Sequence, residues 1–315
     1  MPKKSCIALL AFFLCLAMLA AACGKAPEEP PSQDPPPPVE EEEEEPVPVA
    51  LKKVSPAMVI IDNNPRALPQ SGLQHATIVY ELLVEGGLTR LLALFDTLPE
   101  ENLVIGPIRS LRPYFARQAV EHGGVVAHSG YSQATREQIR GLSLKHIVSG
   151  TYLYRDSSRK RPHNLYTDTE KLYTAAGYDG SYTEVTPEPP LLPPGHEDGR
   201  ELKVEYSRSN IVSYTYDEDT QAYLRFINQE PHTDRDTDLQ YAARRVILRP
   251  ARHTAVPDSK LVDIDLTGEG DGYLYEEGRQ YAIRWVQEEG RTNFYYMDGS
   301  PVDLSFGNTW IQVVR

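Results

Sequence analysis

Residues 77–115 read TIVYELLVEGGLTRLLALFDTLPEENLVIGPIRSLRPYF, and this largely apolar stretch decides the fold. Two apolar segments, 77–84 and 88–95, flank Glu85-Gly86-Gly87. Paired glycines permit a tight turn, so the segments are predicted to form a β-hairpin. Strands joined this closely are antiparallel. Since strands and helices alternate around them, the sheet that contains the hairpin is predicted to be mixed.

Charged residues interrupt this apolar stretch. Strand alternation places Glu81 and Glu85 on one face. Arg90 falls among leucines, and Arg109 and Arg112 flank a turn that opens a helix. An ionised group in an apolar setting costs several kcal/mol unless it is paired. The acids and the arginines are therefore expected to contact each other or a ligand.

The N-terminus predicts an extracytoplasmic location. Two lysines, an apolar run over residues 7–18 and three alanines precede Cys23, as in a secretory signal whose first mature residue is a lipidated cysteine. The run is shorter than the roughly 20 residues that a spanning helix needs. We therefore predict a signal peptide over 1–22 and attachment to the outer face of the cell membrane through lipid on Cys23. Plain secretion after cleavage at Ala22 is the alternative.

Residues 23–53 are predicted to be a disordered tether. They include four consecutive prolines at 35–38 and six glutamates at 40–45, with almost no apolar side chains to bury. Proline and like-charge repulsion extend such a chain to about 90 Å. The whole chain has a formal net charge of -13. This acidity argues against nucleic acid as a partner.

The rest of the chain is predicted to form two domains. Residues 54–188 alternate strands with helices and read as an α/β domain with a mixed sheet. Ser110 is the expected N-cap of a helix over 111–122. Residues 167–170 read as a capping box for a helix closed by Gly177. The other expected elements here are strands 57–62 and 124–128 and a helix over 132–140.

After a proline-rich connector at 186–199, helical periodicity nearly disappears. Residues 200–315 are predicted to form a smaller, mostly antiparallel β domain. The predicted fold class is therefore α/β in the broad sense that includes α+β. The expected strands are 204–206, 211–216, 223–227, 241–248, 261–266, 272–275, 280–286, 292–296 and 310–314.

Several motifs resemble one known family. They include Asn63-Asn64-Pro65, Pro69-Gln70-Ser71-Gly72-Leu73, Glu85-Gly86-Gly87-Leu88-Thr89-Arg90, Ile105-Gly106-Pro107-Ile108-Arg109-Ser110, Pro162-His163-Asn164-Leu165-Tyr166 and Thr309-Trp310-Ile311-Gln312. The chain is similar over residues 54–315 to the YerB-type lipoproteins of Gram-positive bacteria. The resemblance implies a surface lipoprotein with two domains and leaves its biochemical activity open.

Glu81 and Glu85 are the candidate catalytic acids, with His163 as a candidate base. Glycosidases use two carboxylates of this kind. Residues four apart on one strand lie roughly 13 Å from each other, which is wide for such a pair. Pairing of each acid with an arginine is the alternative interpretation.

Arg109, Arg112 and Ser110 form a candidate anion site together with Arg90. Guanidinium donors and a helix N-terminus would converge there on a carboxylate or a phosphate. A salt-bridge network with Glu81 and Glu85 is the alternative.

The basic loop 155–164 contributes the candidate ligand-binding residues Arg161, His163 and Asn164. His128 is a further candidate, because the ends of strands commonly line pockets. A solvated surface loop and satisfied structural histidines are the alternatives for these residues.

We find no motif for a cofactor or a metal and predict neither. The leading functional hypothesis is a non-catalytic binding or scaffolding module of the cell envelope. Its expected ligand is a glycan, an anionic wall polymer or a wall-synthesis protein. The rival hypothesis is a hydrolase or transferase on wall glycan or anionic polymer that uses Glu81, Glu85 and His163. Acids about 5 to 9 Å apart in a pocket would favour glycan chemistry, and acids held by arginines would favour binding or structure.

Overall fold

A computed structural model describes residues 50–148 and 150–315. The predicted signal peptide, Cys23 and most of the predicted tether lie outside these residues. Residues 51–53, which the sequence assigns to the tether, form the start of strand β1 because they pair with strand β9. Within the described ranges, no helix is long and apolar enough to cross a membrane.

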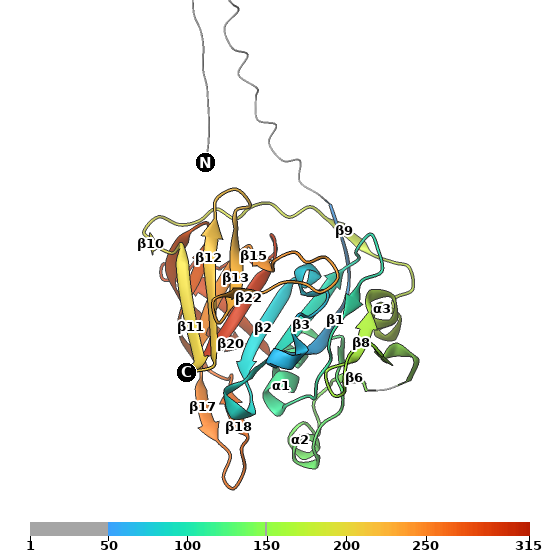
Figure 1. Ribbon diagram of the computed structural model, residues 1–315. Helices are drawn as coiled ribbons and strands as arrows, with labels where there is room; N and C mark the ends of the chain where they lie inside the picture. Colours follow the sequence, from blue (N-terminus) through green and yellow to red (C-terminus); the bar gives the residue numbers. More distant parts are fainter. Residues whose placement is uncertain (1–49, 149) are drawn as a thin grey trace, which may run out of the picture. The chain divides into compact units, whose positions relative to one another are not determined.

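Strands dominate the structure, and three short α-helices accompany them (Figure 1). The helices are α1 Pro113–His122, α2 Gln133–Gln138 and α3 Thr169–Ala176. The strands of the first half are β1 Leu51–Asp62, β2 Ile78–Leu83, β3 Thr89–Thr97, β4 Val104–Ile105, β5 Val125–Ala127, β6 Lys145–Ile147, β7 Tyr154–Arg155, β8 Leu165–Asp168 and β9 Thr183–Val185. Those of the second half are β10 Glu197–Asp198, β11 Glu201–Ser207, β12 Asn210–Asp217, β13 Ala222–Ile227, β14 Glu230–Pro231, β15 Ala242–Ala243, β16 Arg245–Pro250, β17 Arg252–Ala255, β18 Val262–Asp265, β19 Glu269–Glu276, β20 Arg279–Glu288, β21 Arg291–Tyr296 and β22 Thr309–Val314.

The central sheet is mixed, as the sequence predicts. Its strand order is β10-β20-β19-β16-β22-β2-β3-β1-β5-β6, with β21 beside β20 and β9 beside β1. Strands β2 and β3 form the expected antiparallel hairpin across the two glycines. Strands β1, β5 and β6 are parallel to one another, and β22 is parallel to both β2 and β16. The carboxyl ends of β1, β5 and β6 therefore meet at one edge of the sheet.

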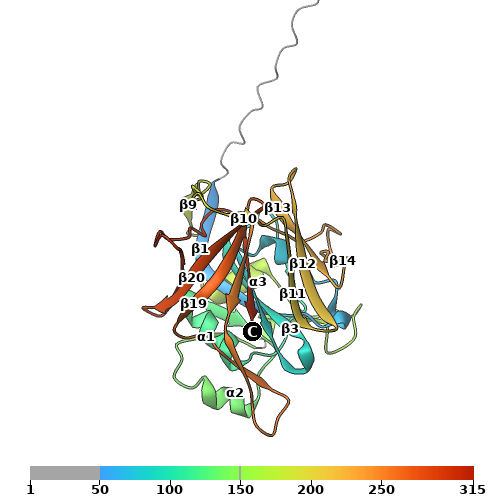
Figure 2. The same cartoon turned by 90° about the vertical axis from the view of Figure 1, so that its left-hand side faces the viewer.

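The central sheet takes strands from both halves of the chain. The last strand, β22, lies between β2 of the first half and β16 of the second. A five-stranded sheet of β11 to β15 lies beside it (Figure 2). The described residues, 50–148 and 150–315, belong to one compact unit by their contacts. The division into an α/β domain over 54–188 and a β-rich domain over 200–315 remains a prediction.

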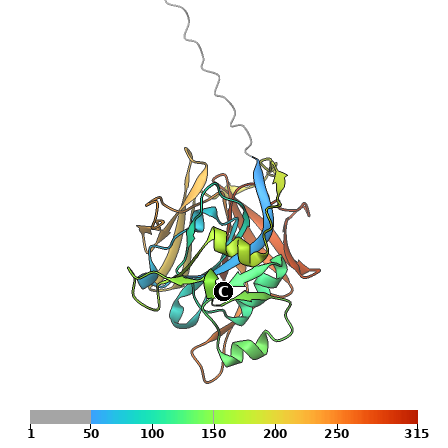
Figure 3. The ribbon, with the colours of Figure 1, turned by 90° about the vertical axis from the view of Figure 1, so that its right-hand side faces the viewer.

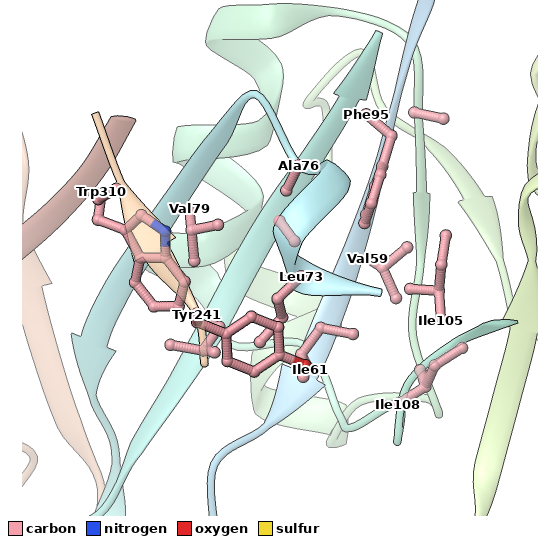
Figure 4. Close-up of a cluster of buried hydrophobic side chains, with 14 of the residues drawn as sticks. Val59, Ile61, Leu73, Ala76, Val79, Phe95, Ile105, Ile108, Tyr241 and Trp310 are labelled. Atoms are coloured by element: carbon pink, nitrogen blue, oxygen red, sulfur yellow. The ribbon is translucent and has the colours of Figure 1, made fainter. Parts of the chain in front are cut away.

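Strands β2, β3 and β22 and the second half of β1 are buried on both faces, which explains why they are largely apolar, whereas β20 alternates buried and exposed residues. On one face Val59, Ile61, Val79 and Trp310 pack with Tyr241, which directly precedes β15, and with residues of the five-stranded sheet (Figure 4). On the other face, Met58, Ile60, Leu92, Leu94 and Ile311 pack with α1. The helix α3 lies against β1 (Figure 3).

Two expected helix caps differ from the structure. The first helix begins at Pro113 with Arg112 as N-cap, so Ser110 does not cap it. A proline disfavours helical geometry in the residue before it, and Arg112 is accordingly extended. The third helix is capped by Asp168, whose side chain accepts from the Lys171 N–H, and not by Thr167.

Acid is expected to destabilise the fold through its buried histidines. Burial lowers the pKa of His122 and His128 to about 4 and that of His232 well below its ordinary value. The unfolded chain takes up these protons near pH 6.5 and the folded chain does not. Stability is therefore complete above pH 6.5 and is lost as the pH falls from 6.5 towards 4. Urea unfolding at pH 7.5 and 5 should give free energies of unfolding that differ by about 2 kcal/mol for each of His122 and His128, and equal values would contradict this account.

Candidate functional site

The candidate site lies at the carboxyl edge of the parallel strands. Ligands of open α/β sheets bind outside the carboxyl ends of such strands. Asp62 ends β1 and His128 directly follows β5, so both lie at this edge. The segment around Pro107 runs alongside, because the Asp62 N–H donates to the Pro107 carbonyl and the Arg109 N–H donates to the Ile60 carbonyl.

Asp62 is the centre of the site. Its side chain is only 4% exposed, and its Oδ2 atom lies 2.7 Å from His163 Nδ1 and 2.8 Å from Arg109 Nε. Its Oδ1 atom accepts a hydrogen bond from the Asn64 N–H. The contact with Arg109 has the distance of an ion pair, but the Nε–H does not point along it. One buried carboxylate thus holds both an arginine and a histidine.

The outer ends of these two side chains remain available to a ligand. Neither the terminal nitrogens of Arg109 nor the Nε2 atom of His163 has a hydrogen-bond partner within the described part of the chain. The Arg109 side chain is 22% exposed and that of His163 is 11% exposed. The site therefore presents a guanidinium fork and an imidazole nitrogen that share one anchor.

Arg90 and Arg112 add positive charge beside this anchor. Both contact Glu85, and the Nη1 atom of Arg90 donates to the Ser110 carbonyl oxygen at 2.7 Å. Burial, together with repulsion from Arg112, lowers the pKa of Arg90 to about 10. Burial acts to raise the pKa of Glu85, but the hydrogen bond from Arg112, a backbone hydrogen bond and the charges of Arg112 and Arg90 together keep it below its ordinary value. Three arginines thus share two carboxylates, Glu85 and Asp62.

Glu81 is held by an arginine that the sequence analysis missed. Its fully buried carboxylate accepts from Arg225 at 2.7 Å and from Thr89 and Asn63 at 2.6 and 3.1 Å. Arg225 comes from β13 and is also completely buried, with its guanidinium 4.5 Å from the ring centre of Trp310. The two charges come from opposite halves of the chain and no local pattern relates them.

A chain of buried amides joins this ion pair to Asp62. The Asn63 side chain donates to Glu81 and accepts from Gln70 Nε2, which also donates to the Asp62 carbonyl oxygen. Gln70 Oε1 lies 2.6 Å from His232 Nε2, and His232 Nδ1 accepts from Arg225 Nε. Because an arginine only donates, the proton of His232 must lie on Nε2. Every one of these polar groups is therefore paired.

The other predicted site residues are less well placed to contact a ligand. Ser110 Oγ lies 3.2 Å from Ser129 Oγ near the same edge. His128 is fully buried, with Nε2 at 2.9 Å from His146 Nδ1. Arg161 is exposed, and its side chain forms no hydrogen bond or ion pair with any described residue. Asn164 is buried and bonds within its own loop, to Arg155 and to two carbonyl oxygens.

A cleft of about 750 Å³ lies at the opposite end of β1. Its lining includes Phe95, Leu98 and Tyr173, and its lysines are engaged, since Lys53 pairs with Asp96 and Lys52 lies over the Tyr182 ring. Its lining includes two acids, Glu100 and Glu101, and no arginine, so the candidate anion site is placed at the edge with Asp62. Among residues 50–148 and 150–315, no three His, Cys, Asp or Glu side chains are grouped as metal ligands.

Comparisons with known proteins agree along the whole folded part. The family described as "Protein of unknown function (DUF3048) N-terminal domain" matches residues 43–182, and its C-terminal domain matches residues 202–311. The "Putative lipoprotein YerB" of Bacillus subtilis is 31% identical over 271 residues, which cover 82% of this chain and 81% of the relative. The crystal structure of the YerB protein from Bacillus subtilis matches with a TM-score of 0.71 at 31% identity, covering 84% of this chain and 91% of that chain.

Proposed function

The chain belongs to the DUF3048 family that includes the putative lipoprotein YerB, and from this premise we propose that it is a membrane-anchored binding or scaffolding module of the cell envelope. Its site takes an anionic group, and the ligand is an anionic wall polymer. The name of the relative supports anchoring by lipid, for which Cys23 is the candidate. In this proposal the chain binds the polymer at the outer face of the cell membrane.

One observation carries the proposed binding role. Asp62 holds the inner atoms of Arg109 and His163, and their outer nitrogens have no partner in the described ranges. A guanidinium fork matches the oxygens of a phosphate or a carboxylate. Because Arg90 and Arg112 lie close by, the local field favours an anion. This supports a phosphate-bearing polymer over a neutral glycan.

The glycosidase alternative receives less support. It needs two carboxylates that face a substrate, and Glu81 is completely buried against Arg225. Glu85 is not on the strand with Glu81, because β2 ends at Leu83, and it is held by Arg112 and Arg90. Acids held by arginines are the arrangement associated with binding or structure.

Arg109→Ala is expected to weaken binding of a polyglycerol phosphate polymer at least tenfold, which corresponds to about 1.4 kcal/mol. The reason is the loss of the guanidinium fork at this edge of the sheet, whose terminal nitrogens no described residue engages. Isothermal titration of the polymer against the detergent-solubilised full chain measures this. The matched control is Arg284→Ala, because Arg284 is a half-exposed arginine paired with Glu269 on another strand.

Wild-type affinity should fall with added salt, since the contacts are charged and partly exposed. Equal affinity of wild-type, Arg109→Ala and Arg284→Ala proteins for the polymer would overturn the proposed site. An equal loss in both variants would show that the binding responds only to net charge.

A further inference from the structure

We propose that Asp62, His163 and Arg109 form a centre that hydrolyses a phosphodiester. The proposal rests on the anion site of the preceding subsection and assigns a reaction to it. The substrate class is a diester of phosphate with alcohols, as in a polyol phosphate polymer. His163 is the general base, Arg109 binds the phosphate and Asp62 is a positioning residue.

The hydrogen bonds fix the proton on His163. A carboxylate accepts hydrogen bonds, so the 2.7 Å contact with Asp62 places the imidazole proton on Nδ1. The Nε2 atom then carries the lone pair. A buried carboxylate that orients an imidazole in this way is the arrangement by which histidine acts as a general base. Here Asp62 is 4% exposed, and the Asn64 N–H holds its other oxygen.

The shared anchor places base and phosphate site side by side. His163 Nδ1 and Arg109 Nε both lie within 2.8 Å of the same oxygen, Asp62 Oδ2. Both side chains therefore extend from one oxygen, with His163 Nε2 and the Arg109 terminal nitrogens as their outer ends. The proposal places the phosphate on the Arg109 fork and the attacking water at His163 Nε2. Neighbouring backbone contacts hold the two segments together, since the Ile108 N–H donates to the Leu165 carbonyl.

The reaction balances without any further reagent. His163 Nε2 takes one proton from water while the water oxygen forms a bond to phosphorus. The bond from phosphorus to one alcohol oxygen then breaks, and that oxygen leaves with the proton returned by the imidazolium. The products are a phosphate monoester and a free alcohol. Arg109 stabilises the charge that builds up on the phosphate oxygens.

Hydrolysis of bis(4-nitrophenyl) phosphate by the detergent-solubilised full chain tests this assignment. We expect release of 4-nitrophenol above the buffer rate, and a decrease of at least 100-fold in His163→Gln, the usual scale for a general base. Arg109→Ala should raise KM and lower kcat. The matched control is His196→Gln, because His196 is exposed and remote from this edge, and it should retain the wild-type rate.

A second pair of measurements separates chemistry from folding. His163→Ala should regain activity when imidazole is added, which a variant with a collapsed site would not do. The dependence of the rate on pH should differ between wild-type and Asp62→Asn proteins, because the variant lacks the carboxylate that accepts from His163 Nδ1.

The outcomes distinguish this proposal from the one on which it rests. Polymer binding that depends on Arg109, without any release of 4-nitrophenol, would overturn the hydrolytic centre and leave the binding site standing. Hydrolysis that His163→Gln does not reduce would also overturn it. Loss of hydrolysis in His163→Gln together with retained polymer binding supports both.

Discussion

Replacing Arg225 by methionine is expected to lower the free energy of unfolding by about 3 to 5 kcal/mol. The substitution keeps most of the apolar contact with Trp310 but removes the guanidinium that lies 2.7 Å from Glu81. The Glu81 carboxylate then stays buried with only Thr89 and Asn63 as partners. An uncompensated buried charge is among the largest single penalties that a substitution produces. Urea unfolding of wild-type and Arg225→Met proteins measures the difference.

Two further variants make this expectation specific. Arg284→Met removes an arginine from an exposed pair with Glu269 and should cost less than about 1 kcal/mol. Adding Glu81→Gln to Arg225→Met should restore part of the loss, because the stranded charge is then gone. If adding Glu81→Gln lowers the free energy of unfolding of Arg225→Met further, the two residues do not form one unit.

The sequence predicts the fold well where the signal is local. The hairpin of β2 and β3 follows from two apolar segments and two glycines, and strand periodicity locates most strands of the second half. It does not predict the pairing of strands that are distant in the sequence. Strand β22 is inserted between β2 and β16, which makes one sheet of both halves. Pairing between strands so far apart depends on the complete three-dimensional packing.

The candidate site shows the same limit. The apolar setting of Glu81, Glu85 and the arginines indicates that these charges must be paired, and the structure pairs them. The partners themselves were not predictable, because Arg225 lies in a strand of ordinary appearance. Asp62 was missed although the signal was present, since it is a charged residue at the end of a buried strand. The crevice rule for parallel strands would have pointed to it.

Asp62→Asn is expected to cost about 3 kcal/mol of stability and to abolish the common anchor of the site. An amide is neutral and cannot form the ion pair with Arg109, and it has a single oxygen for the two donors that Asp62 now serves, His163 Nδ1–H and the Asn64 N–H. Either the His163 side chain or the backbone N–H must face the amide nitrogen. Arg109→Ala alone should cost only about 1 kcal/mol, because it leaves Asp62 with two of its three partners.

A double-mutant cycle shows whether Arg109 acts through Asp62. If Asp62 fixes the direction of the guanidinium, Asp62→Asn should weaken polymer binding almost as much as Arg109→Ala does. The double variant should then bind no more weakly than Arg109→Ala, because without its anchor Arg109 contributes little binding free energy. Additive losses of binding free energy across the cycle would mean that Arg109 is directed by other contacts. In that case the carboxylate at the end of β1 supports the fold and does not organise the site.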